Sequence, residues 1–137
     1  MTGFIQSQIK NPTRSLTPLD KASATVTTVN QVLATTGAGL VVPATNTTVR
    51  SEIMGIANES ITATQALTQV LAIEIFENDT FVVDSLNNSN AAHNYQRMIL
   101  SDSLTVDNTG VDDANGVVVQ VEPYGPAADK KIIVRFV

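Results

Sequence analysis

Short apolar runs separated by turn-forming residues recur along the chain and predict β-strands. Residues 69–76 (QVLAIEIF) and 80–84 (TFVVD) are the clearest pair of such runs. Between them stand Asn78 and Asp79, and both residue types tolerate the positive φ that a tight reversal requires. We therefore predict that the two runs form a β-hairpin.

The end of the chain predicts two more strands, in residues 116–124 and 130–137. Apolar residues alternate in both segments, which places them on one face of each strand. An apolar strand that ends at the last residue has to be paired in a sheet, because an open apolar edge promotes aggregation. We therefore predict that the terminal strand is structural and central to the fold. The side chains expected on the two buried faces are Val117, Val119 and Val121, and Ile132, Val134 and Phe136.

Further strand candidates lie in residues 24–35 and 48–56 and in a short run that Pro43 closes, and residues 95–103 form either a strand or a single helical turn. Together the candidates amount to seven or eight short strands at intervals of about ten residues, with turn signals between them. Such spacing is typical of an all-β sandwich or barrel. We predict an all-β fold, a single compact β-sandwich or β-barrel that occupies residues 24–137.

Residues 1–23 show little periodicity and contain Pro12 and Pro18, which favour extended backbone. We predict an extended N-terminal arm for this segment. Its apolar side chains would either cover the core of the same domain or bind a neighbouring subunit. The residues expected to make the contact with a subunit or a capsid are Phe4, Ile5 and Ile9.

Composition narrows the classes of function. Only 15% of the residues are charged, against about a quarter in ordinary proteins, and the net charge is −5. The basic residues are scattered, so the sequence predicts no nucleic-acid partner. The chain has no Cys, which excludes disulfide scaffolds, thiol nucleophiles and zinc–thiolate sites. Without a signal-like segment or an apolar run of membrane-spanning length, we expect synthesis in a cytoplasm and no membrane partner.

Catalytic motifs are scarce. The single histidine, His93, lies in a polar loop (NNSNAAHN) with no adjacent nucleophile or carboxylate, and is expected to be a solvated loop residue. No G-x-S-x-G, G-x-G-x-x-G or phosphate-binding-loop motif occurs. We predict a protein that is not an enzyme, with no catalytic residue and no cofactor. A hydrolase or lyase on a β scaffold stays open as an alternative, because its groups would meet only in space.

One acidic loop, residues 107–115, offers the oxygen ligands that Ca²⁺ prefers. Its spacing departs from the EF-hand pattern, and no Glu closes the loop. The sequences DNTG and DANG each end in Gly and predict turns instead. We therefore predict a long connection between strands and no metal site. The weak candidates for metal ligands are Asp107, Asp112 and Asp113.

The segments between Gly37 and Val137 resemble, in their order and style, the small capsid decoration (cement) proteins of tailed bacteriophages. The segments that carry the resemblance are GAGLVVPATNTTVRSEIMGIANESI, VLAIEIFENDTFVVD, YQRMILSDSLTVDNTGVDDANGVVVQV and YGPAADKKIIVRFV. The resemblance implies a structural virion protein without catalytic groups. Extended termini in such proteins clasp capsid subunits, which agrees with the predicted arm.

The resemblance also implies partners and a location. We expect the protein to bind the outside of a phage capsid, with the major capsid protein as its partner, and to stabilise it across subunit seams. We expect a homo-oligomer, with a trimer preferred and a dimer possible. It would be synthesised in the host cytoplasm and then located on the capsid surface. The alternative is a phage tail or fibre module that binds a host-surface glycan, which would require clustered aromatic side chains at the surface.

Overall fold

The computed structural model describes residues 2–8, 16–110 and 112–137. Within these residues the chain forms eleven β-strands, four short 3-10 helices and no α-helix, so the predicted all-β fold is confirmed. The strands are β1 (Ile5–Gln8), β2 (Leu16–Asp20), β3 (Val32–Thr35), β4 (Val41–Pro43), β5 (Ile53–Ala57), β6 (Gln69–Ile73), β7 (Thr80–Ser85), β8 (Arg97–Asp102), β9 (Thr105–Asp107), β10 (Val118–Pro123) and β11 (Lys131–Phe136). The 3-10 helices are η1 (Arg50–Glu52), η2 (Ala63–Gln65), η3 (Ala91–His93) and η4 (Ala127–Asp129).

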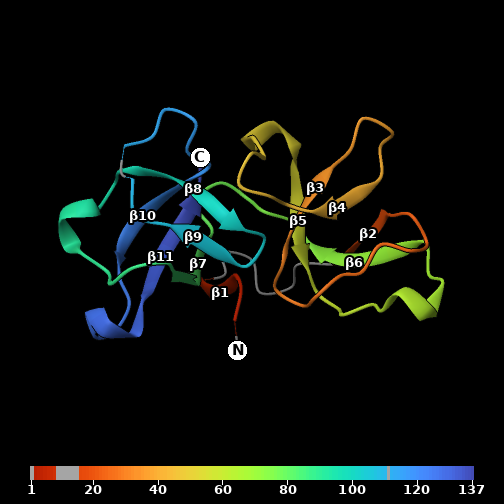
Figure 1. Cartoon of the computed structure of the whole chain (residues 1–137), viewed down its shortest axis with the longest axis horizontal. Coiled ribbons are helices and arrows are strands. Elements are labelled where there is room, and N and C mark those ends of the chain that lie inside the picture. Colours follow the sequence, from red (N-terminus) through yellow and green to blue (C-terminus); the bar gives the residue numbers. More distant parts are fainter. Residues whose placement is uncertain (1, 9–15, 111) are drawn as a thin grey trace.

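Five strands close into a barrel in the order β7-β11-β10-β8-β9. The closing pair, β9 with β7, is parallel and joins Thr105 to Asp84 and Val106 to Ser85. β1 pairs with the first part of β7, so β1 and β9 share one edge of that strand. We call β1 together with residues 77–137 the barrel half of the molecule (Figure 1, left).

The other five strands form an antiparallel sheet in the order β2-β6-β5-β3-β4. We call residues 16–76 the sheet half (Figure 1, right). Both of its edge strands contain a proline, Pro18 in β2 and Pro43 in β4. Because proline has no N–H to donate, each edge is a poor template for the addition of another strand.

The two halves share one hydrophobic core, and β3 lies at its centre. Val32 and Ala34 face the barrel, whereas Leu33 points to the opposite side of the sheet and packs with Val70 in a second, smaller core. Both faces of β3 are therefore buried, as expected for a strand whose apolar residues are continuous. The backbone N–H of Val32 also donates to the carbonyl of Ser103, 2.8 Å away, which links the two halves directly.

The expected separation of an N-terminal arm from the β domain is wrong for the described part of that segment. Phe4 is 1% exposed and belongs to the shared core, and Ile5 is half-buried opposite Val82. β2 is a full strand of the sheet half, paired with β6 over its whole length. Ile9, the third residue expected to make an outside contact, lies outside the described residues. The apolar side chain of Phe4 is buried within its own fold, which was the other possibility for this segment.

The predicted hairpin between residues 69–76 and 80–84 is also wrong, although its turn is correct. Asn78 has φ 67°, and the N–H of Asp79 donates to the carbonyl of Phe76 at 3.1 Å. The strands on either side belong to different sheets, since β6 pairs with β2 and β5 while β7 pairs with β1, β9 and β11. The turn sets a reversal of direction, but the burial of each strand in its own sheet decides the pairing.

The two C-terminal strands differ in how well they match the alternation of buried and exposed residues that the sequence predicted. In β11 the alternation is confirmed, and the strand is paired on both sides, with β7 and β10. In β10 it is wrong, because residues 117–120 are all buried and a bulge follows Gln120. Val118 points into the shared core, while Val119 on the opposite face is flanked by Arg97 and Arg135 on the neighbouring strands. Long arginine stems beside an apolar residue help to cover it.

Candidate functional site

The carboxylates of the acidic loop serve its turns. One oxygen of Asp107 accepts from the N–H of Thr109 at 2.9 Å, and one oxygen of Asp113 accepts from the N–H of Asn115 at 2.8 Å. Asp112 adopts a left-handed conformation, with φ 61°. Among the described residues no group of three or more His, Asp or Glu side chains could hold a metal ion. The structure thus does not bring the three candidate ligands together as a metal site.

His93 is not the solvated loop residue that its polar surroundings suggested. It ends η3, is half-buried, and its Nδ1 is buried without a partner among the described residues. Gln120 of the adjacent β10 is fully buried, and its Nε2 donates to the carbonyl of Asn90 at 2.9 Å and to Oδ1 of Asn94 at 2.8 Å. These bonds attach the polar loop to the barrel, so the loop has a structural role.

Lys21 is one of the basic residues scattered along the sequence, and in the structure it is only 2% exposed. Its ammonium group donates to the carbonyls of Leu67 at 2.6 Å, Ala22 at 3.1 Å and Ser23 at 3.5 Å. The three N–H groups of a lysine can each find an acceptor in this arrangement. Nothing in the sequence around Lys21 distinguishes it from an exposed lysine, because its main partner is 46 residues away.

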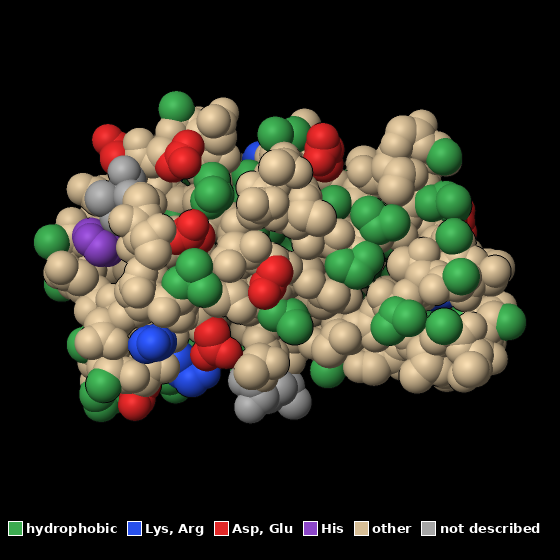
Figure 2. Space-filling view, viewed as in Figure 1, with side chains coloured by type: hydrophobic (Ala, Val, Ile, Leu, Met, Phe, Trp, Pro, Cys, Tyr) green, Lys and Arg blue, Asp and Glu red, His purple; other side chains and the backbone are tan. Residues whose placement is uncertain are grey.

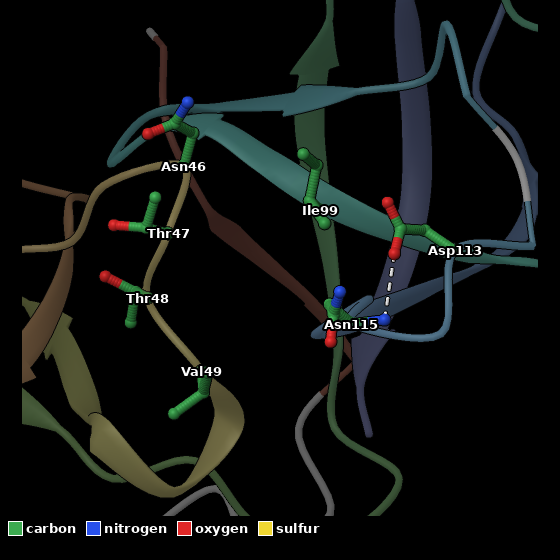
Figure 3. A pocket seen from close by; sticks show the side chains of 7 residues that line it. All are labelled: Asn46, Thr47, Thr48, Val49, Ile99, Asp113 and Asn115. Carbon is green, nitrogen blue, oxygen red and sulfur yellow. Dashed lines mark hydrogen bonds between the residues drawn. The ribbon is translucent and has the colours of Figure 1, made fainter.

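A cleft of about 270 Å³ lies where the two halves meet. One side is residues 46–49, from the loop between β4 and η1. The other side is Ile99 of β8 with Asp113 and Asn115 of the acidic loop, as Figure 3 shows. The cleft therefore combines amides, hydroxyls and one carboxylate with the apolar surface of Ile99 and Val49.

Apolar and charged side chains are distributed unequally between the two halves. The sheet half contains 6 charged residues and the equally long segment 77–137 contains 13. On the face seen in Figure 2, apolar side chains gather over the sheet half, whereas most acidic and basic ones lie over the barrel half. Of the ten large apolar side chains that are exposed in the described part of the chain, seven belong to the sheet half: Leu16, Val26, Val49, Met54, Leu67, Leu71 and Phe76.

Three of the exposed residues of the sheet half form a small apolar face on β2 and β6. Leu16 is opposite Ile73, and Pro18 is opposite Leu71, so these four side chains lie on the same side of the sheet. That side is the one that packs against the barrel, since Ile73 contacts the shared core. Towards the edge of the sheet the same side is exposed, at Leu16, Pro18 and Leu71. We call Leu16, Pro18 and Leu71 the open face.

Comparison with known proteins identifies no relative: no protein-family model matches the chain, and no curated protein matches its sequence. Function therefore has to be inferred from the open face, the cleft and the distribution of charge. No helix in the described ranges is long and apolar enough to cross a membrane.

Proposed function

We propose that this protein is a structural, non-enzymatic component of a virus particle that binds the outside of the capsid and stabilises the contacts between capsid subunits. The observation that carries the proposal is the unequal distribution of side chains. The sheet half exposes most of the large apolar residues, and the barrel half holds most of the charge. A protein with this polarity suits attachment by one end, with the charged end in water.

The open face supports attachment by the sheet half. Leu16 and Leu71 are 39% and 38% exposed, so their remaining apolar surface is available to a partner. Burial of apolar area yields about 25 cal/mol per Å². A stable pairwise interface needs about 800 Å² from each partner, which three side chains do not supply alone. Such a surface suits a contact that is repeated many times on a shell, where each copy adds a small stabilisation.

The edges of the sheet support the same mode of binding. Pro18 and Pro43 hinder the addition of a partner strand to either edge. The sheet half is thus suited to binding through its face, and not through its edge. This arrangement would leave the protein free to cover a seam between subunits without forming fibres of its own.

The partners and location proposed for the protein follow from the resemblance to capsid decoration proteins. The partner would be the major capsid protein, and the protein itself would be a homo-oligomer, preferably a trimer, on the capsid surface after synthesis in the host cytoplasm. Light scattering should give a molar mass that is a multiple of 14.5 kDa. A mass of 14.5 kDa at micromolar concentration would contradict the oligomer.

The attachment is tested by sedimentation of the protein with purified capsids that lack it. We expect the wild type to co-sediment, and the double variant Leu16→Ser/Leu71→Ser to bind at least about tenfold more weakly, a loss of about 1.4 kcal/mol. The matched control is Leu86→Ser, because Leu86 is similarly exposed, at 42%, but belongs to the barrel half.

Two results would count against the proposal. If the wild-type protein does not bind capsids, the proposed function is wrong. If it binds and the Leu86 variant is weakened as much as the double variant, the sheet half is not the attachment surface. Circular dichroism of each variant would show that its fold is retained.

A further inference from the structure

We propose that the cleft between the two halves is a binding site for a neutral polyhydroxyl ligand, of the size of one sugar ring. This site is separate from the open face, and the inference does not depend on attachment to a capsid. It rests on the polar groups that the cleft leaves unused, on the rigidity of its two sides and on its charge.

Each side of the cleft has some side-chain hydrogen-bonding groups that make no bond within the described protein. Asn46 and Asn115 are exposed and their side-chain amides have no protein partner there, and the second carboxylate oxygen of the half-buried Asp113 has none. Other polar side chains of these two loops are used, as in the bond from the N–H of Thr45 to Oγ1 of Thr48 at 2.9 Å. The cleft therefore holds two amides and a carboxylate oxygen that a ligand can engage.

The side formed by residues 46–49 is held rigidly. The N–H of Thr48 donates to the carbonyl of Thr45 at 3.2 Å, and the hydroxyl groups of Thr45 and Thr47 lie 3.1 Å apart. Immediately after this loop, the guanidinium carbon of Arg50 lies 5.9 Å from the centre of the Phe136 ring, in the other half of the molecule. This contact links the end of the loop to the barrel.

The opposite side is equally fixed. The N–H of Asp113 donates to the carbonyl of Arg97 at 3.0 Å, and the N–H of Gly116 donates to the carbonyl of Asp113 at 2.9 Å. Gly116 lies so close to β8 that an added Cβ would be 2.6 Å from Cβ of Arg97. Because both sides are ordered before binding, a ligand would not have to order them.

The chemistry of the cleft favours a neutral polyol over other classes of ligand. Among the described residues no Lys or Arg lines it, and Asp113 would repel an anion. A single carboxylate is too few for a hard divalent cation. Hydroxyl groups both donate and accept, so they match amides and a carboxylate together. Ile99 and Val49 offer apolar surface for the C–H groups of a sugar ring.

The size of the cleft limits the ligand. Its volume of about 270 Å³ lies just below the range of about 300–1,000 Å³ that is usual for small-molecule sites. No aromatic side chain of the described residues lines the cleft, so the stacking platform that a host-glycan module would require is missing, and only weak binding of single sugars is expected. We expect dissociation constants of about 1–10 mM for single sugars.

The experiment is a ¹⁵N–¹H NMR titration of the full chain with glucose, galactose, mannose and N-acetylglucosamine, each added separately. At least one sugar should cause saturable shifts confined to the amides of residues 46–49, 99 and 113–115. Asp113→Asn keeps an acceptor for the turn but removes the charge, and should weaken binding about tenfold, as expected when a charge-assisted hydrogen bond is lost.

The matched control is Asp112→Asn. It removes the charge of the neighbouring residue, whose side chain does not line the cleft. It should leave the affinity within about twofold of the wild type, the usual effect of a distant surface substitution. The proposal is overturned if none of the four sugars causes saturable shifts, if the shifts lie elsewhere, or if the two variants weaken binding equally. Binding of an extended peptide in the cleft, with no binding of sugars, would also overturn it.

Discussion

The rings of Phe4 and Phe136 pack with their centroids 5.4 Å apart, so residues at opposite ends of the chain share one core. Phe81 of β7 contacts both, at 6.4 Å from Phe4 and 5.6 Å from Phe136. Three aromatic rings in this arrangement bury a large apolar area and add favourable edge-to-face contacts. The N-terminal strand thus belongs to the folded domain and is expected to contribute to its stability.

We predict that Phe4→Ala lowers the free energy of unfolding by about 3–5 kcal/mol, the usual cost of removing a buried aromatic ring. Urea denaturation followed by circular dichroism measures this change. Tyr124→Ala is the control, because Tyr124 is 48% exposed and its loss should cost less than about 1 kcal/mol. A loss of under about 1 kcal/mol for Phe4→Ala as well would mean that the segment is a separate arm after all.

The sequence predicted the fold class and the terminal strand for a clear physical reason. In β11, alternate positions are apolar, and the strand has one face in the core, so period-two alternation is visible. In β10 and β3 both faces are buried, and alternation disappears. Proline content misled the interpretation of residues 1–23, because an edge strand such as β2 tolerates a proline that a central strand does not.

The cleft and the open face could not have been predicted in the same way. The two sides of the cleft are at least 50 residues apart in sequence, and they meet only because β3 and the barrel share a core. From the sequence, Leu16 falls in the predicted arm and Leu71 in a predicted strand, and nothing marks the two as neighbours on one exposed face. Their exposure depends on how far the barrel extends over the sheet, and no local pattern contains that information.

The turn from Asp113 to Gly116 gives a second prediction. Gly116→Ala should destabilise the protein by about 1–3 kcal/mol, as overpacking does, because the new methyl group would lie 2.6 Å from Cβ of Arg97 and 2.7 Å from the backbone N of Met98. Gly37→Ala is the matched control, since no atom lies within 4 Å of the position of its added Cβ. Thermal unfolding of the two variants compares them. Equal melting temperatures would show that the turn is not pressed against β8.

A third prediction concerns the buried ammonium group of Lys21. Lys21→Met keeps most of the length of the side chain but leaves the carbonyl of Leu67 without its donor at 2.6 Å. Hydrogen bonds to a charged group contribute about 1.5–3 kcal/mol, so the free energy of unfolding should fall by about that amount. Lys130→Met, at an exposed position, should change it by less than about 0.5 kcal/mol. Equal stabilities of the two variants in urea denaturation would contradict a structural role for Lys21.

The last prediction concerns the edge of the sheet half. Pro18→Val should promote self-association, because valine favours β-structure and restores an N–H group at the middle of edge strand β2. Thr17→Val is the matched control, since it raises β-propensity at the neighbouring position without adding a backbone donor. Size-exclusion chromatography over a range of concentrations would show a shift towards larger species for the Pro18 variant alone. If both variants elute like the wild type, the proline does not protect this edge. If the Thr17 variant associates equally, the cause is the added apolar surface, and the N–H group restored at position 18 is not the cause.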